Sequence, residues 1–208
     1  MSKLFFDVDT QNDFIRFDGA LSVPGAEEII PNLEKLTQFA RTNEIQIMGS
    51  IDRHYGDEAH KEKEVELAKW GGHFPEHCMN GSAGQEKIPE TTPLDPALIA
   101  NRAYTLEELK TLVKGKKETY FEKQSYDVFD NPNVTKLTRA FDEVVVYGVA
   151  TDYCVLMAAL GFRTRGKRVF VVRDAIKAVN AKPGDEERAL SKMKEAGIEF
   201  VNTSDITK

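Results

Sequence analysis

Three side chains spread along the chain could together support nucleophilic catalysis. Cys154 lies in the stretch YGVATDYCV, Asp9 follows the run KLFFDV, and Lys123 ends the run ETYFEK. A thiol near a helix N-terminus feels the positive end of the helix dipole, and a neighbouring ammonium group also favours the thiolate. A carboxylate can take the thiol proton as a general base. Each residue alone has a structural explanation, since a free cysteine is often only a buried apolar side chain. The combination of the three favours a catalytic role over a structural one.

A second cluster could bind a metal ion. Asp52, His54 and His60 lie close together in the sequence DRHYGDEAH, and the other two histidines of the chain, His73 and His77, follow soon after. Imidazole and carboxylate ligands suit zinc, iron or manganese, and three protein ligands with an open position are typical of a catalytic site. A polar surface loop is the alternative, but it does not explain why every histidine falls in one segment. Spacing alone does not decide between His73 and His77.

The elements that must position these residues follow from the apolar pattern. Short apolar runs predict strands, and apolar spacings of three and four predict helices. Together they predict a parallel sheet covered by helices on both faces, with ligands bound beyond the carboxyl ends of the strands. The polar residues named above follow predicted strands, so we expect them to meet at that edge. The predicted strands are 3–8, 45–51, 118–122, 143–149, 168–173 and 198–201, and the predicted helices are 26–42, 105–114, 133–140, 152–165 and 184–196.

Length and composition limit the function classes. The 208 residues predict a single domain over 1–208, with a loop excursion around 52–90 that is rich in glycine, proline, histidine and charge. A net charge of −6 argues against binding to nucleic acid or to an anionic membrane. The sequence has no apolar run typical of a signal peptide or a membrane helix, and Cys78 and Cys154 do not form a disulfide framework. We therefore expect a cytoplasmic protein with reduced thiols. The sequence does not decide whether the protein forms a homo-oligomer.

Five motifs in order along the chain resemble the isochorismatase-like cysteine hydrolases, and within them the nicotinamidase branch. FFDVDTQNDF resembles the opening strand with its catalytic aspartate, and SIDRHYGDEAH resembles the Asp-x-His-x5-His metal motif. FPEHC resembles a segment whose histidine also binds the metal, which favours His77 over His73. YFEKQSYDVF resembles the strand that ends in the catalytic lysine, and YGVATDYCV resembles the nucleophile motif.

The resemblance implies a fold and a set of roles. The fold is a three-layer α/β/α sandwich with a six-stranded, mostly parallel sheet. The implied catalytic triad is Asp9, Lys123 and Cys154, and the backbone N–H groups of Ala150 and Cys154 form the oxyanion hole. A cis peptide bond between Val149 and Ala150 is also implied. The implied metal ligands are Asp52, His54, His60 and His77.

The resemblance also suggests how a substrate is held. Phe14 and Phe74 match positions that sandwich a pyridine ring, although plain core packing explains them about equally well. Gln11 and Tyr153 are further expected substrate contacts. Thr10 departs from the family, which usually has an aliphatic residue there, and Tyr153 stands where histidine is frequent. These departures bear on specificity more than on reactivity.

The implied function is hydrolysis of nicotinamide to nicotinate and ammonia through a thioester, with a divalent metal, zinc before iron or manganese, orienting the pyridine. The expected partner is a small carboxamide, with no nucleic acid and no membrane. A related hydrolase of another carboxamide or carbamoyl compound is the alternative within the family. A non-catalytic metal- or ligand-binding relative is the alternative from another class.

Overall fold

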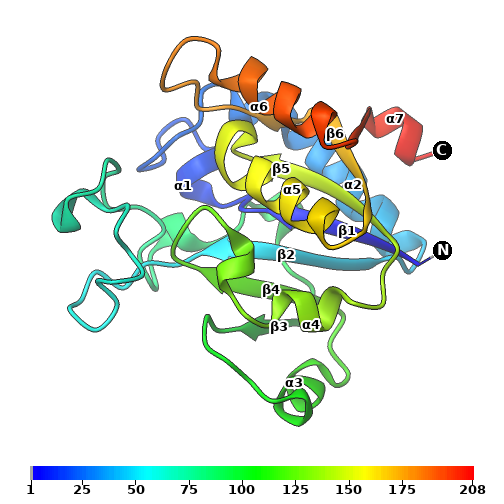
Figure 1. Ribbon diagram of the computed structural model, residues 1–208, viewed down its shortest axis with the longest axis horizontal. Helices are drawn as coiled ribbons and strands as arrows, with labels where there is room; N and C mark the ends of the chain where they lie inside the picture. The colour runs from blue at the N-terminus through cyan, green and yellow to red at the C-terminus, as the bar shows by residue number, and fades with distance from the viewer. Residues whose placement is uncertain (1) are drawn as a thin grey trace.

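Seven parallel strands form one sheet in the computed structural model, which describes residues 2–208 (Figure 1). Their order across the sheet is β3-β4-β2-β1-β5-β6-β7, and every neighbouring pair is parallel. The predicted sandwich of helices and a parallel sheet is confirmed, with seven strands in place of six. The strands are β1 (Lys3–Val8), β2 (Gln46–Asp52), β3 (Pro96–Ile99), β4 (Glu118–Lys123), β5 (Glu143–Val149), β6 (Arg168–Lys177) and β7 (Glu199–Val201).

The additional strand is β3, which lies at one edge of the sheet beside β4. It is only four residues long, and its sequence, PALI, begins with a proline. Proline is tolerated at the start of an edge strand because it has no N–H group to donate to a second neighbour. Leu98 is 48% exposed, so the run is not uniformly buried. This short, half-exposed segment gave too little apolar signal to be predicted as a strand.

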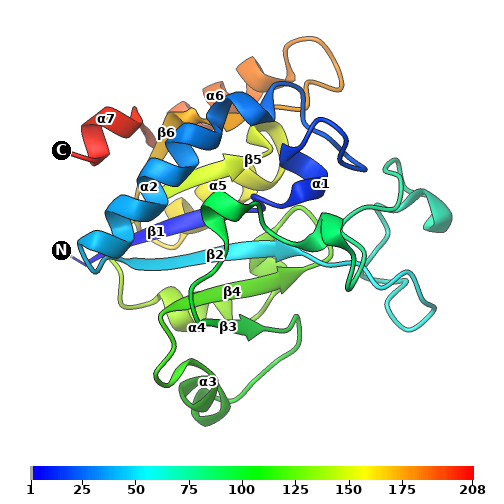
Figure 2. The same ribbon diagram turned by 180° about the vertical axis from the view of Figure 1, so that it is seen from behind.

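Helices cover both faces of the sheet. α2 (Ile30–Thr42) and the short α7 (Thr203–Ile206) contact each other on one face, where α2 lies in front in Figure 2. The opposite face carries α5 (Leu156–Thr164) and α6 (Asp185–Glu195), with α5 in front in Figure 1. Two separate apolar cores therefore form, one on each side of the sheet. The remaining helices are α1 (Asn12–Ile15), α3 (Leu106–Val113) and α4 (Val134–Thr138).

The link between β5 and α5 carries the candidate nucleophile. The peptide bond between Val149 and Ala150 is cis, as the resemblance implied, and residues Thr151–Val155 form one π-helical turn before α5 begins. Gly148 has φ of 117°, and a Cβ atom there would lie 2.0 Å from the carbonyl oxygen of Val8. Only glycine therefore lets β5 approach β1 so closely just before this turn.

The segment between β2 and β3 is mostly irregular and projects beyond the carboxyl ends of the strands (Figure 1). Three short 3₁₀ turns interrupt it, Ala68–Trp70, Ala83–Gln85 and Pro89–Thr91. Isolated backbone bridges tie it down, including one between His54 and Met79 and one between Gln11 and Lys87. Among residues 2–208, no helix has the length and apolar character that crossing a membrane requires.

Phe162 packs α5 against the sheet through its contact with Phe6. Its side chain is fully buried. The centroid of its ring lies 4.9 Å from the ring centroid of Phe6 on β1 and 5.0 Å from that of Phe129. Replacement by alanine would remove an entire buried ring, so we expect Phe162→Ala to lower the free energy of unfolding by about 3–5 kcal/mol in urea denaturation. Met157→Ala is the control on the same helix, because Met157 is 37% exposed, and it should cost less than about 1 kcal/mol. Equal losses would contradict this role.

Candidate active site

The carboxyl ends of four adjacent strands bring the predicted polar residues together. Lys123 ends β4, Asp52 ends β2, Asp9 directly follows β1, and Cys154 follows β5. These strands are neighbours in the order β4-β2-β1-β5. The expectation that these residues meet at one edge of the sheet therefore agrees with the structure.

Lys123 connects two carboxylates at this edge. Its Nζ lies 2.9 Å from Oδ2 of Asp9 and 3.3 Å from Oδ1 of Asp52, and all three side chains are almost completely buried. Burial works against the charged ammonium, but the carboxylates of Asp52 and Asp9 hold the pKa of Lys123 well above its usual value. Lys123 is therefore a permanent cation between the two aspartates.

The surroundings of Cys154 favour the neutral thiol over the thiolate. Burial raises its pKa well above the usual value, and Lys123 lowers it, while the carboxylates of Asp9 and Asp52 raise it again. The expected effect of Lys123 is present, but burial and the carboxylates outweigh it. A buried neutral thiol needs a base to become a nucleophile. Asp9, held beside Lys123, is the predicted base for that step.

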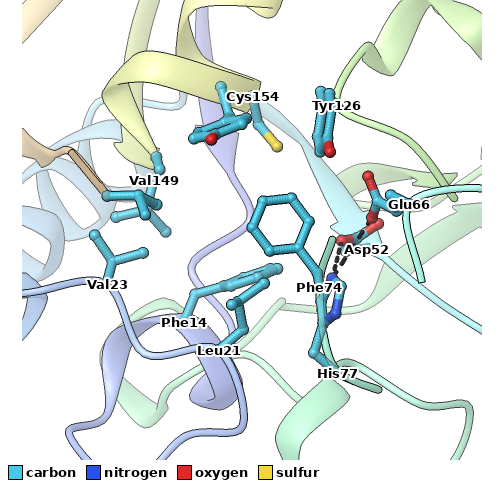
Figure 3. Close-up of a pocket in the computed structure, with 13 residues that line it drawn as sticks. Phe14, Leu21, Val23, Asp52, Glu66, Phe74, His77, Tyr126, Val149 and Cys154 are labelled. Carbon is cyan, nitrogen blue, oxygen red and sulfur yellow. Dashed lines mark ion pairs between the residues drawn. The ribbon is translucent and has the colours of Figure 1, made fainter. Parts of the chain in front are cut away.

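A partly open cavity adjoins this group: Asp52 and Cys154 line it, whereas Asp9 and Lys123 lie outside its lining. Figure 3 shows the sulfur of Cys154 pointing into it, and Ala150 is part of the same wall. Most of the remaining lining is apolar or aromatic, with Phe14, Phe74 and Tyr153 among it. Cavities of this kind, apolar with a few converging polar groups, bind small organic molecules.

The expected substrate contacts agree with this cavity in part. Phe14, Phe74 and Tyr153 line it, and so does Tyr126, which the sequence reasoning missed. The rings of Phe74, Tyr126 and Tyr153 meet edge to face, with centroids 5.1–6.0 Å apart. Tyr126 lies three residues after Lys123 in a motif already singled out, so its place in that motif was the available signal.

Gln11 is not part of the cavity lining. Its side chain is fully buried and spans the backbone of Asp52, donating from Nε2 to the carbonyl oxygen and accepting the N–H at Oε1, at 2.8 and 2.7 Å. Nε2 also donates to the carbonyl oxygen of Gln85. The expected substrate contact is corrected on this point, because these backbone groups already engage the amide. Gln11 holds Asp52 in place.

Four buried side chains form a group that could hold a metal ion. One ligand atom from each of Asp52, His54, Glu66 and His77 lies within 4.8 Å of the others. Nε2 of His54 is 3.4 Å from Oδ2 of Asp52 and 3.2 Å from Oε1 of Glu66, and Nε2 of His77 is 3.3 and 3.5 Å from the same oxygens. Asp52, Glu66 and His77 also line the cavity, where Figure 3 draws their ion pairs.

The chemistry of this group fits a divalent transition metal. Nδ1 of His77 lies 2.7 Å from the carbonyl oxygen of Pro75, which can only accept, so Nε2 is the nitrogen that faces the group. No residue that the structure describes hydrogen-bonds to the buried Nε2 of His54 or to Oε2 of Glu66. Two imidazoles and two carboxylates are a ligand set that zinc, iron and manganese accept.

The electrostatics of the group also call for a cation. Burial opposes protonation of the imidazoles, but the neighbouring carboxylates of Asp52 and Glu66 outweigh it and raise the pKa of His54 to about 9 and that of His77 to about 10. Two buried carboxylates therefore draw positive charge into this place. Protons on the imidazoles or a divalent ion would supply that charge.

His60 does not belong to this group, which corrects the expected ligand set. Its Nδ1 lies 2.7 Å from Oδ1 of Asp57, its ring stacks on Tyr55 with centroids 4.0 Å apart, and about a third of its side chain is exposed. Glu66 completes the group instead. In the sequence, Glu66 lies in the charged run KEKEVELAK, where nothing distinguishes it from a surface residue. Its burial depends on the path of the loop.

A further buried carboxylate lies behind His54. Glu64 is fully buried, and its oxygens accept the backbone N–H groups of Tyr55 and Gly56 at 2.5 and 2.9 Å. Its Oε1 lies 3.9 Å from Nδ1 of His54. This separation is too long for a hydrogen bond, and Nδ1 of His54 has no hydrogen-bond partner among residues 2–208. Glu64 therefore fixes the backbone of Tyr55 and Gly56, directly after His54, and adds negative charge behind the imidazole ring.

Comparison with known proteins agrees with this architecture. The family model of the isochorismatase domain matches residues 3–205. The chain is 27% identical to the nicotinamidase of Escherichia coli, over 95% of this chain and 93% of that protein. It is 31% identical to an isochorismatase family protein of Bacillus subtilis, over 86% and 88% of the two chains. The crystal structure of a pyrazinamidase of Pyrococcus horikoshii in complex with zinc superposes with a TM-score of 0.75, at 28% identity, over 97% of this chain and 99% of that chain.

The corrected ligand set leads to a direct comparison of two variants. Glu66→Gln removes a charged ligand, so we expect zinc affinity, measured by competition with a chromophoric chelator, to fall at least about tenfold. His60→Gln should leave the zinc affinity unchanged, because His60 points away from the group. The opposite ranking of the two variants would restore His60 as a ligand and remove Glu66.

Proposed function

The chain belongs to the isochorismatase family, and we propose that it is a nicotinamidase-type cysteine amidohydrolase that converts nicotinamide to nicotinate and ammonia. One observation supports this most directly. Cys154 and three members of the candidate metal group line the same aromatic cavity, so a nucleophile and a site for a heterocyclic nitrogen face one small space. Relatives that are themselves nicotinamidases support the same choice of substrate.

We assign the metal group to substrate positioning. Asp52, His54, Glu66 and His77 would hold a divalent ion, most simply zinc, whose open coordination position would bind the pyridine nitrogen and orient the ring. Phe14 and Phe74, which line the cavity, would pack against the ring. Fixing a substrate against its nucleophile in this way lowers the entropic part of the barrier.

The proposed reaction begins with the transfer of a proton. Asp9 takes the proton of the Cys154 thiol, and the thiolate attacks the carboxamide carbon. Lys123 remains charged throughout and keeps the Asp9 carboxylate in place. The raised pKa of the buried Cys154 thiol supports this order, because a thiolate already stabilised by its surroundings would not need the base.

The tetrahedral intermediate carries a negative oxygen that needs donors. The backbone N–H groups of Ala150 and Cys154, on the wall beside the sulfur, are the proposed oxyanion hole. One such preorganised donor is typically worth about 3–4 kcal/mol of barrier. Collapse of the intermediate breaks the C–N bond, and Asp9 returns its proton to the departing ammonia. A thioester between Cys154 and the nicotinoyl group is left.

Hydrolysis of the thioester completes the cycle. Asp9 takes a proton from a water molecule, and the resulting hydroxide attacks the thioester carbon. The second tetrahedral intermediate collapses to nicotinic acid and the thiolate of Cys154. The acid loses its proton to water or to the released ammonia and becomes nicotinate, and the thiolate recovers its proton from Asp9. Every proton taken by Asp9 is returned within one turnover, so the enzyme ends in its starting state.

The proposal predicts that the purified protein releases ammonia from nicotinamide, and that Cys154→Ser lowers kcat by more than about 1,000-fold because the nucleophile is lost. Cys78→Ser is the matched control. Cys78 is also buried, but it lies outside the cavity lining, so its variant should keep activity close to that of the wild type. A coupled ammonia assay on metal-loaded protein measures both.

Two results would contradict the proposal in different ways. Ammonia release by Cys154→Ser at the wild-type rate would rule out the thioester. No release from nicotinamide by the wild type, together with release from another carboxamide or a carbamoyl compound, would keep the mechanism and replace the substrate.

A further inference from the structure

A buried ion pair lies directly beneath the turn that carries Asp9. Asp7 is on β1, and its Oδ2 is 3.0 Å from Nζ of Lys87, with both side chains about 99% buried. The ammonium of Lys87 also lies 4.9 Å from the ring centre of Tyr120 on β4. The remaining side chains on this face of β1 and its neighbours are mostly apolar. A charged pair here therefore needs an explanation other than core packing.

The hydroxyl of Thr10 completes this arrangement. It lies 2.8 and 3.0 Å from the two carboxylate oxygens of Asp7, 3.1 Å from Nζ of Lys87 and 2.7 Å from the hydroxyl of Thr91. Its single proton must go to Asp7, because a carboxylate can only accept. Thr10 then accepts from Lys87 and from Thr91. The hydrogen-bonding capacity of the Thr10 hydroxyl is fully used, so its position is determined from three directions.

Burial of the Asp7–Lys87 pair removes two charges from water, and this desolvation costs free energy that offsets their attraction. Burial raises the pKa of Asp7 even though Lys87 acts to lower it. Apolar side chains of similar volume commonly replace buried ion pairs with no loss of stability. The value of such a pair lies more often in fixing one arrangement of the chain than in stability. Its place in the fold shows which arrangement that is.

The turn itself needs outside support. Asp9 has φ of +46°, in the left-handed region that residues with a side chain rarely occupy. Such a conformation persists only when the surrounding structure holds it. Asp7 lies two residues before Asp9 and Thr10 directly after it, so the hydrogen bonds of these two side chains restrain the backbone on both sides of the unfavourable residue.

The pair also anchors the loop that packs against the turn. Residues 85–91 run alongside residues 10–12: the N–H of Ile88 donates to the carbonyl oxygen of Thr10 at 3.0 Å, and the N–H of Asn12 to that of Glu86 at 2.8 Å. Lys87 lies between these two bonds and brings its ammonium to Asp7. The turn and residues 85–91 are therefore joined by backbone and side chain together.

We propose that Asp7, Lys87 and Thr10 form a positioning unit that holds the Asp9 turn in the conformation in which its carboxylate meets Lys123 and can reach Cys154. The inference rests on the proposed function for the role of Asp9. None of the three residues lines the cavity, so they act on the reaction through the backbone that they hold and not by contact with the substrate.

Two variants test this unit. Thr10→Val keeps the volume and both charges but removes the shared hydroxyl, and Asp7→Leu/Lys87→Met replaces the whole pair by apolar side chains. We expect each to fold, with kcat for nicotinamide reduced about tenfold or more and KM changed less than about threefold, because a small displacement of a catalytic group slows the chemical step without weakening binding. Lys87→Arg keeps the positive charge beside Asp7, so this single variant should keep most of the wild-type kcat.

Controls separate positioning from general stability. Lys116→Met breaks an exposed ion pair with Asp95 and should change neither kcat nor KM. Thermal melting and zinc content are measured on every variant. Wild-type kcat in both Thr10→Val and the double variant would overturn the proposal. So would a loss of kcat that matches the unfolded fraction. If the double variant does not fold, Thr10→Val decides alone.

A substrate-free measurement keeps this test distinct from that of the proposed function. The rate of alkylation of Cys154 by iodoacetamide, followed by mass analysis of its peptide, depends on Asp9 as base but not on nicotinamide. Slower alkylation in Thr10→Val supports the positioning unit even if the wild type releases no ammonia from nicotinamide. Unchanged alkylation in both variants would overturn the unit even if nicotinamide is the substrate.

Discussion

The ammonium of Lys123 is the charge around which the site is built. It lies between Asp9 and Asp52 at the carboxyl end of β4, away from water, and each carboxylate would be costly to bury without it. Because Asp52 turns its other oxygen toward His54 and His77, the same cation links the proposed base to the candidate metal group. The two halves of the site are therefore electrostatically coupled, and a change of charge in one half alters the electrostatic energy of the charged groups in the other.

The sheet explains how this charge comes to be shared. β4, β2, β1 and β5 are adjacent and parallel, so residues at their carboxyl ends converge although they are far apart in the chain. The approach is then refined by contacts that do not touch the cavity: Gln11 spans the backbone of Asp52, and the pair of Asp7 and Lys87 lies under the Asp9 turn. In this account, a rigid sheet sets the position of the reacting groups, and a surrounding layer of buried polar groups sets their orientation.

What could be predicted from the sequence follows from these same features. Asp9, Asp52, Lys123 and Cys154 each follow an apolar run, so the parallel-sheet rule was enough to bring them together. Glu66 could not be predicted, because a buried glutamate in a charged run differs from an exposed one only through the path of a long loop. The same holds for the contact between Asp7 and Lys87, which joins residues that no local pattern connects. β3 was missed because it is short, starts with proline and is half exposed.

The most direct test of the central claim is the intact mass of the protein during turnover. Metal-loaded enzyme is mixed with nicotinamide, quenched in acid within one turnover and analysed by mass spectrometry, with the modified peptide identified afterwards. The account predicts an added nicotinoyl group on the peptide that contains Cys154, and no addition in Cys154→Ser. Steady ammonia release by a protein that never carries this group, or that carries it elsewhere, would contradict the thioester mechanism.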